Sequence, residues 1–175
     1  PGISGTAGGT YISGPSPAAL TITAGSNAAF TWRYTANAAG NIAFSSRASG
    51  TDKSSGDAIS TNVSTSNLIT VQTPSNLVAS VTAQPGTVNT MQDVTVVVTI
   101  LNNGQAGVTN ALPVINTVGT GTASVSSSPS AAPINGGASA AFTFVYTANT
   151  AGNIIFSARA SGVDNNDGTT KYSNY

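Results

Sequence analysis

The side chains able to do chemistry are few, and they lie in loops between apolar stretches. The sequence contains no histidine, cysteine or glutamate, so the most common nucleophiles, general bases and soft metal ligands are missing. No pair of carboxylates stands out from the turns around it. We therefore predict that the chain is not an enzyme and has no catalytic or cofactor-binding residue. The five acidic residues are Asp52, Asp57, Asp93, Asp164 and Asp167.

The segment closest to a metal site runs from Asp164 to Gly168. Oxygen ligands on Asp164, Asn166 and Asp167 would suit calcium. Their spacing does not fit an EF-hand loop, and the matching loop at 52–57 has a different sequence. We favour a polar loop in which aspartate side chains accept hydrogen bonds from nearby backbone N–H groups, as in Asx turns. Calcium is the alternative.

Two arginines occupy one position of a repeated pattern. Asp52 follows Arg47 by five residues, and Asp164 follows Arg159 by the same interval. An ion pair between strand and loop is one interpretation, although an exposed pair contributes only about 0–1 kcal/mol. Contact with a neighbouring repeat or subunit is the other. We favour the structural role.

Three further features could carry function. Lys53 and Lys171 could form isopeptide crosslinks, but both lie in polar segments, whereas such a bond needs a buried lysine. Trp32 could stack on a sugar, but Phe144 replaces it in the second copy of the pattern, which favours core packing. Asn62 begins the only N-glycosylation triplet.

A long duplication organises the elements that hold these residues. Residues Ala28 to Asp52 read AAFTWRYTANAAGNIAFSSRASGTD, and residues Ala140 to Asp164 read AAFTFVYTANTAGNIIFSARASGVD. The copies lie 112 residues apart without a gap, and 19 of 25 positions are identical. A period of this length corresponds to a whole domain, since solenoid units span about 20–50 residues. The chain is therefore expected to belong to a tandem array.

Apolar residues alternate within the duplicated block. Phe30, Trp32 and Tyr34 share one face of a predicted strand, and Ile42 and Phe44 share one face of the next. The second copy keeps this phase. A short turn-rich connection separates the strands, which predicts an antiparallel pair with one buried face.

Other short strands are expected along the chain, and no helix is. The clearest is Asp93 to Leu101, with four β-branched residues on one face and an Asn-Gly turn signal after it. Further strands are predicted at residues 21–23, 58–64, 67–73, 76–81, 108–118 and 123–127.

About seven strands per period predict an all-β chain of tandem immunoglobulin-like β-sandwiches. The first domain covers residues 1–74 and is expected to be N-terminally incomplete, because Pro1 falls opposite Pro113. The second covers residues 75–175 and lacks a counterpart of residues 67–73. The missing strands belong either to a longer array or to neighbouring subunits, in a form of strand complementation.

Composition limits the partners. Charged residues make up 6% of the chain, against about 25% in typical proteins, and the net charge is zero. Nucleic acids and anionic membranes both need clustered cations, so neither is expected. No apolar run is long enough to span a membrane. A neutral surface of Ser, Thr, Asn and Gly suits a secreted or cell-surface protein and favours self-association.

One family resemblance rests on two strings. TVVVTILNNGQAGVTNALP, at residues 95–113, and AAFTFVYTANTAGNIIFSARASGVD, at residues 140–164, resemble bacterial and archaeal surface repeats of the CARDB type, the cell adhesion related domain found in bacteria. The resemblance implies an extracellular β-sandwich with no catalytic residues. Such modules serve as stalks, adhesins and filament subunits.

Two functions follow from these observations. The first is a structural repeat subunit of an extracellular filament, surface layer or stalk, which assembles with copies of itself. The alternative is an adhesion module at the cell surface that binds a carbohydrate or protein ligand through its loops.

Overall fold

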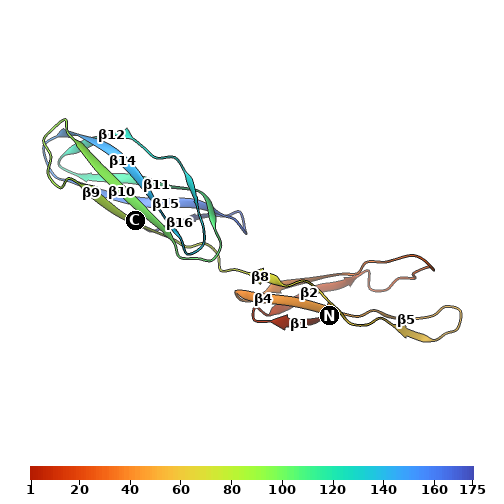
Figure 1. The fold of residues 1–175 in the computed structure, drawn as a ribbon. Coiled ribbons are helices and arrows are strands. Elements are labelled where there is room, and N and C mark those ends of the chain that lie inside the picture. Colours follow the sequence, from red (N-terminus) through yellow and green to blue (C-terminus); the bar gives the residue numbers. More distant parts are fainter. The chain divides into compact units, whose positions relative to one another are not determined.

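The computed structural model describes residues 1–175 and consists entirely of strands, turns and loops (Figure 1). The predicted all-β class is therefore confirmed. The chain divides into two compact units, Pro1–Gln72 and Thr73–Tyr175, here called unit 1 and unit 2. No helix in the chain could cross a membrane.

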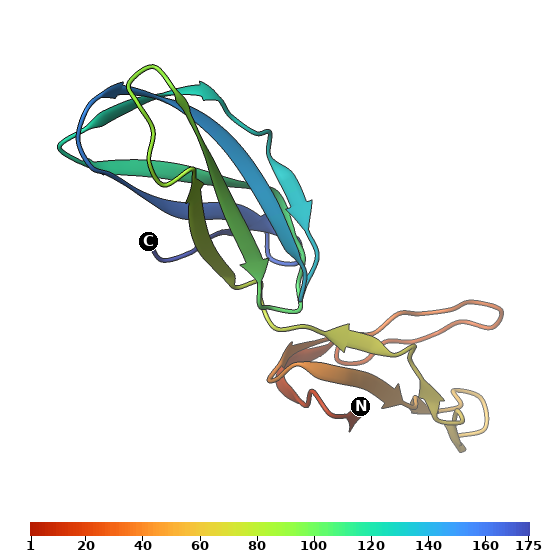
Figure 2. The ribbon, with the colours of Figure 1, turned by 60° about the vertical axis from the view of Figure 1, so that its left-hand side comes forward.

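Unit 2 contains two antiparallel four-stranded sheets (Figure 2). The first has the order β12-β14-β10-β9 and the second the order β13-β11-β15-β16. The strands of the first sheet are β9 (Leu77–Gln84), β10 (Asp93–Asn102), β12 (Thr122–Ser127) and β14 (Ser139–Thr150). The strands of the second sheet are β11 (Val108–Gly119), β13 (Ala132–Ile134), β15 (Ile154–Asp164) and β16 (Thr170–Tyr172).

The two sheets of unit 2 share one hydrophobic core. Alternate residues of β10 and β14 point inward and meet small or branched residues of β11 and β15. This is the predicted inward phase, and β10 begins at the predicted residue and ends one residue later. The fully buried hydrophobic residues of β10 are Val96, Val98 and Ile100, each at 0% exposure.

The two strands of the duplicated block do not pair with each other, so the predicted antiparallel pair is wrong. β14 lies in one sheet and β15 in the other, and the exposed turn at residues 151–153 leads from the first sheet to the second. Tyr146 and Phe156 meet across that gap, with ring centroids 5.0 Å apart. Residues 103–107, which include the Asn-Gly pair, likewise connect β10 to β11 in the opposite sheet rather than forming a hairpin. Alternation shows which face is buried, but not which strand lies alongside.

Unit 1 is built from shorter strands and smaller sheets. β1 (Gly2–Gly5), β4 (Gly40–Ser46) and β7 (Ser64–Thr65) form one sheet, in which β8 (Ile69–Val71) also pairs with β4. The remaining strands form two-stranded sheets, β2 (Gly9–Ser16) with β3 (Thr31–Ala36) and β5 (Ser49–Thr51) with β6 (Ala58–Ser60). The strand predicted at residues 67–73 is thus only three residues long.

Unit 1 reproduces part of unit 2 in detail. β2 pairs with β3 as β12 pairs with β14, and a register shift follows Tyr11 in one unit and Val125 in the other. β5 and β6 pair as the end of β15 pairs with β16. Tyr34 and Phe44 repeat the aromatic contact between sheets at 5.0 Å. The duplication in sequence is therefore a duplication of structure.

The repeat offset before the duplicated block is 114 residues rather than 112. Ala7 N donates to Asn41 O at 3.1 Å, and Gly121 N donates to Asn153 O at the same distance. Gly5 therefore corresponds to Gly119, and the predicted alignment of Pro1 with Pro113 is wrong by two residues. The Gly- and Ser-rich segment contains too few apolar residues to fix the register from sequence.

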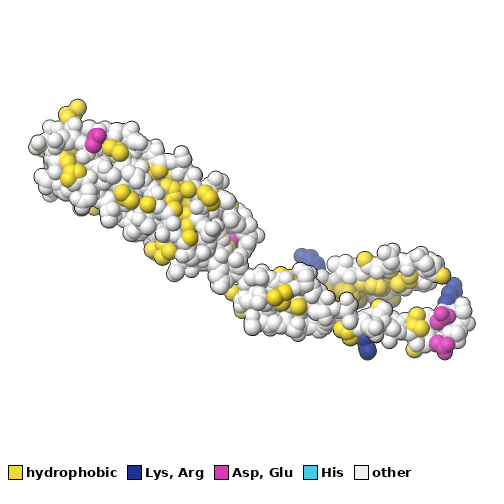
Figure 3. Space-filling model, in the orientation of Figure 1, with side chains coloured by type: hydrophobic (Ala, Val, Ile, Leu, Met, Phe, Trp, Pro, Cys, Tyr) yellow, Lys and Arg dark blue, Asp and Glu magenta, His cyan; other side chains and the backbone are white.

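Unit 1 has much less core than unit 2. Its buried hydrophobic residues are Ala7, Ile42 and Ala43. Nothing in unit 1 occupies the places of β9, β10 and the first half of β11. The strand predicted at residues 21–23 does not form; its counterpart β13 pairs with that half of β11. Large hydrophobic side chains remain exposed along unit 1 (Figure 3), namely Ile3, Tyr11, Ile12, Leu20, Ile22, Ile59, Val63, Leu68 and Ile69.

Candidate functional site

Asp164 is the most buried acidic residue, at 1% exposure. Its Oδ1 accepts hydrogen bonds from the backbone N–H groups of Asn166 at 2.8 Å and Asp167 at 3.3 Å, which are the predicted Asx-turn bonds. Its Oδ2 accepts from Ser75 N at 2.7 Å and Ser75 Oγ at 2.8 Å. Burial alone would raise the pKa of Asp164, but these four bonds outweigh it and hold the pKa below its ordinary value.

Asp167 likewise binds nearby protein groups with both of its carboxylate oxygens. Its Oδ1 accepts from Thr169 N at 2.8 Å and Thr169 Oγ1 at 2.6 Å. Its Oδ2 forms an ion pair with Lys171 Nζ at 2.9 Å. The bonds from Thr169, with help from Lys171, lower the pKa of Asp167 to about 2.

The three calcium candidates, Asp164, Asn166 and Asp167, therefore lie in one loop. Both carboxylates of that loop already accept hydrogen bonds from protein donors. The positively charged ammonium group of Lys171 lies beside Asp167 and would repel a metal cation there. No group of three or more acidic, histidine or cysteine side chains gathers anywhere in the chain. The bonding accounts for the loop as a structural turn.

The arginines do not pair with the aspartates that follow them. In unit 2 the guanidinium of Arg159 lies over the ring of Tyr172, 4.4 Å from its centroid, and 5.9 Å from that of Tyr175. Its Nε also donates to Ser173 O at 3.3 Å. Because Asp164 is held by Ser75, the predicted strand-to-loop ion pair is replaced by cation–π contacts.

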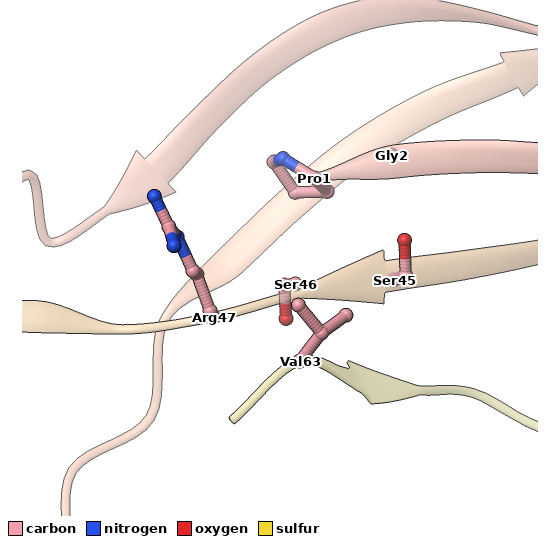
Figure 4. A pocket seen from close by; sticks show the side chains of 6 residues that line it. All are labelled: Pro1, Gly2, Ser45, Ser46, Arg47 and Val63. Carbon is pink, nitrogen blue, oxygen red and sulfur yellow. The ribbon is translucent and has the colours of Figure 1, made fainter. Parts of the chain in front are cut away.

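The same place in unit 1 is a shallow pocket (Figure 4) of about 270 Å³. Ser60 and Val63 stand where unit 2 has Tyr172 and Tyr175, so no ring covers Arg47. Arg47 is the single charged side chain of a lining otherwise made of Pro1, Gly2, Ser45, Ser46 and Val63. One cation among small groups gives neither a catalytic pair nor a set of metal ligands.

The most distinctive surface feature of unit 1 is an unpaired strand edge. One edge of β3 pairs with β2, and the other carries no strand. On the face that turns inward in unit 2, this strand region presents Phe30, Trp32 and Tyr34, all half-buried. Phe30 and Trp32 rings lie 6.5 Å apart. Such an edge offers backbone N–H and C=O groups beside an apolar row, as strand-addition sites do.

Asn102 and Ser75 are buried polar residues of unit 2 that were not predicted. Asn102 is fully buried, and its Oδ1 accepts from the backbone N–H groups of Asn76 and Gly104, both at 3.1 Å. Its Nδ2 donates to Ala106 O at 2.8 Å. Ser75 holds Asp164. The sequence signal for Asn102 was its place directly after the apolar residues of a predicted strand. For Ser75 the sequence offered no signal of burial other than the neighbouring Pro74.

Comparisons with known proteins add no relative. The chain matches no protein-family model, no curated protein and no solved structure.

Proposed function

We propose that the chain is a structural repeat subunit of an extracellular filament, surface layer or stalk. Its units are immunoglobulin-like β-sandwiches of the CARDB-type surface repeats, and neighbouring repeats join by packing and by strand complementation. Localisation at the cell surface and assembly with copies of itself belong to the same proposal.

The observation that carries the proposal is the repetition of bonding detail in two units. The shifted register of β2 on β3 recurs in β12 on β14, and the hairpin of β5 with β6 recurs in β15 with β16. Repeats that preserve such detail suit a structural role in which many copies of one module are joined into an assembly.

Complementary gaps support the assembly mode. β8 pairs with the first residues of β4, but no strand pairs with the matching residues 152–154 of unit 2 on that side. β10 pairs with β14, but no strand pairs with the matching edge of β3. Each unit thus lacks a strand that the other unit shows in place, and an unfilled edge invites pairing.

The surface chemistry fits the same role. The chain has five basic and five acidic residues in 175, and the single ion pair joins Asp167 to Lys171, four residues later. Charge repulsion therefore opposes self-association very little. Figure 3 shows the scarcity of charged side chains on one face of the molecule.

Labelling of intact cells tests the proposal. An antibody against the chain should label unpermeabilised source cells, and electron microscopy should show the label on filaments, a layer or stalks. Label that appears only after lysis, together with purified chains that stay monomeric at high concentration, would contradict the proposed function.

A further inference from the structure

The open edge of β3, meaning the edge of Thr31–Ala36 that faces away from β2, has an occupied counterpart in the same molecule. In unit 2 the matching edge of β14 pairs with β10 over nine consecutive residues, from Asp93 to Leu101. β14 is 12 residues long, whereas β3 is six. The duplicated sequence is therefore able to form a strand with neighbours on both edges.

Side-chain burial shows what the open edge lacks. Phe142, Phe144 and Tyr146 are 3%, 7% and 9% exposed, because the inward residues of β10 pack beside them. Their counterparts Phe30, Trp32 and Tyr34 are only half-buried. Strand addition at the open edge would bury this aromatic row, and burial of apolar area is the main driving force of such contacts.

The pairing of β10 on β14 fixes the register at the open edge. Val94 lies opposite Tyr146, Val96 opposite Phe144 and Val98 opposite Phe142. With the 112-residue offset of the duplicated block, those three positions of an incoming strand face Tyr34, Trp32 and Phe30.

A separate contact points to the same occupant. Asp164 is held both by its own loop and by Ser75, two residues before β9. Its counterpart Asp52 is held only from its own loop, by the backbone N–H groups of Ser54 at 2.8 Å and Ser55 at 3.0 Å. A segment that brings a β10-type strand to unit 1 would also bring a counterpart of Ser75 toward Asp52.

We propose that the open edge of β3 accepts a β-hairpin of the β9–β10 type, supplied by another repeat of this kind outside residues 1–175. The hairpin adds antiparallel to β3 in the register given above. This inference names the partner of the strand complementation in the proposed function and rests on it for its biological meaning.

A peptide with the sequence of residues 76–104 tests the inference on the full chain. It contains no aromatic residue, and Trp32 is the only tryptophan of the chain, so tryptophan emission reports on the open edge alone. Binding should shift that emission to the blue and lower acrylamide quenching severalfold, with saturation. No change at saturating peptide would overturn the proposal.

Two altered peptides provide the matched control. Replacing the inward residues by serine (Val94→Ser, Val96→Ser and Val98→Ser) should abolish the shift. Replacing the outward residues of the same strand (Thr95→Ser, Val97→Ser and Thr99→Ser) should leave most of it. Equal binding by both would show a contact that does not use the proposed face.

Disulfide trapping tests the register, because the natural chain has no cysteine. Val97 lies opposite Thr143, the counterpart of Thr31. A Val97→Cys peptide should crosslink to a Thr31→Cys chain, since directly opposite Cβ atoms lie about 4.5–5.5 Å apart. It should not crosslink to a Thr35→Cys chain. Preferential trapping at residue 35, or chain–chain dimers through residue 31 that exclude the peptide, would overturn the register or the occupant.

The results separate this inference from the proposed function. Peptide binding without label at the cell surface keeps the hairpin site and removes the surface role. Surface filaments whose chains neither bind the peptide nor bury Trp32 keep the surface role and remove the hairpin site.

Discussion

Asp52 and Asp164 occupy one position of the repeat but differ in what they touch. Both side chains accept hydrogen bonds from backbone N–H groups two and three residues ahead. Only Asp164 is also bound by Ser75, and only Asp164 is buried. The bonds within the loop therefore explain why both positions hold aspartate. The contribution of the side chain to stability depends on whether a second segment, such as the one with Ser75, also binds it.

The first prediction uses this pair of aspartates. Asp164→Ala should lower the free energy of unfolding of unit 2 by about 1–3 kcal/mol, because the buried donors of Ser75 lose their acceptor. Asp52→Ala is the matched control and should change unit 1 little. Denaturant unfolding followed by circular dichroism measures both. Similar effects at the two positions would show that the Ser75 contact is not important.

The second prediction concerns acid. Folding lowers the pKa values of Asp164 and Asp167, the latter from 3.8 to about 2. Above about pH 5 both carboxylates are charged whether the chain is folded or not, so their stabilisation is fully present. As the pH falls from about 5 toward 2, the unfolded chain binds protons first and unit 2 loses stability.

Denaturant midpoints measured at several pH values between 5 and 2 test this prediction. The midpoint of unit 2 should fall across that window, and Asp167→Asn should make the fall shallower. A midpoint that is independent of pH in this range, or that rises as acid is added, would contradict the bonding described for the loop.

At the scale of elements, β3 and β14 show that neighbours determine strand length. Their sequences are nearly the same, but β14 lies between two strands and β3 beside one. Residues 28–30, for which the sequence predicts a strand, lie outside β3. A strand with one free edge loses half of its potential ladder bonds, so its ends are the first part to depart from regular pairing.

The third prediction compares matched truncations in these strands. Phe144→Ala should cost about 3–5 kcal/mol, because it leaves a cavity in a packed core. Trp32→Ala should cost about half as much, because its side chain is only half-buried in the isolated chain. Unfolding free energies of the two units provide the test. An equal or greater loss at Trp32 would show that unit 1 already has a complete core.

The sequence predicted the elements better than their partners. Alternating residues correctly identified the inward faces of β10, β14 and β15, because a buried face imposes its period on the residues themselves. The short turn between β14 and β15 predicts an antiparallel pair, but a short connection can join strands within a sheet or between sheets.

The candidate site was predictable only in part. The loop at Asp164 was recognised as a turn, because Asx-turn bonds depend on nearby residues. Ser75 and Asp164 are 89 residues apart, and no local pattern signals a contact at that distance. The open edge of β3 likewise depends on which strands are present around it, which its own residues do not encode.

At the scale of the molecule, the units should differ in stability. Unit 2 has a contiguous core drawn from both of its sheets, whereas unit 1 buries three hydrophobic residues. Net stability is a small difference between large terms, so this contrast in burial should make unit 1 clearly less stable than unit 2.

The fourth prediction is therefore two unfolding transitions. Trp32 fluorescence reports on unit 1 alone and should change at lower denaturant than the main loss of strand signal in circular dichroism. A control chain with Trp32→Phe and Phe144→Trp should move the fluorescence change to the later transition. Coincident transitions for both probes would show that the two units unfold as one.

The hairpin site gives the most direct test of the account. A second copy of residues 75–114 placed before Pro1 supplies unit 1 with the strands that unit 2 has, in the register of the 114-residue offset. Amide hydrogen exchange of Thr31–Ala36 should then slow to the rates of the matching residues in β14. Exchange at those six residues that is unchanged from the natural chain would contradict the assignment of the open edge.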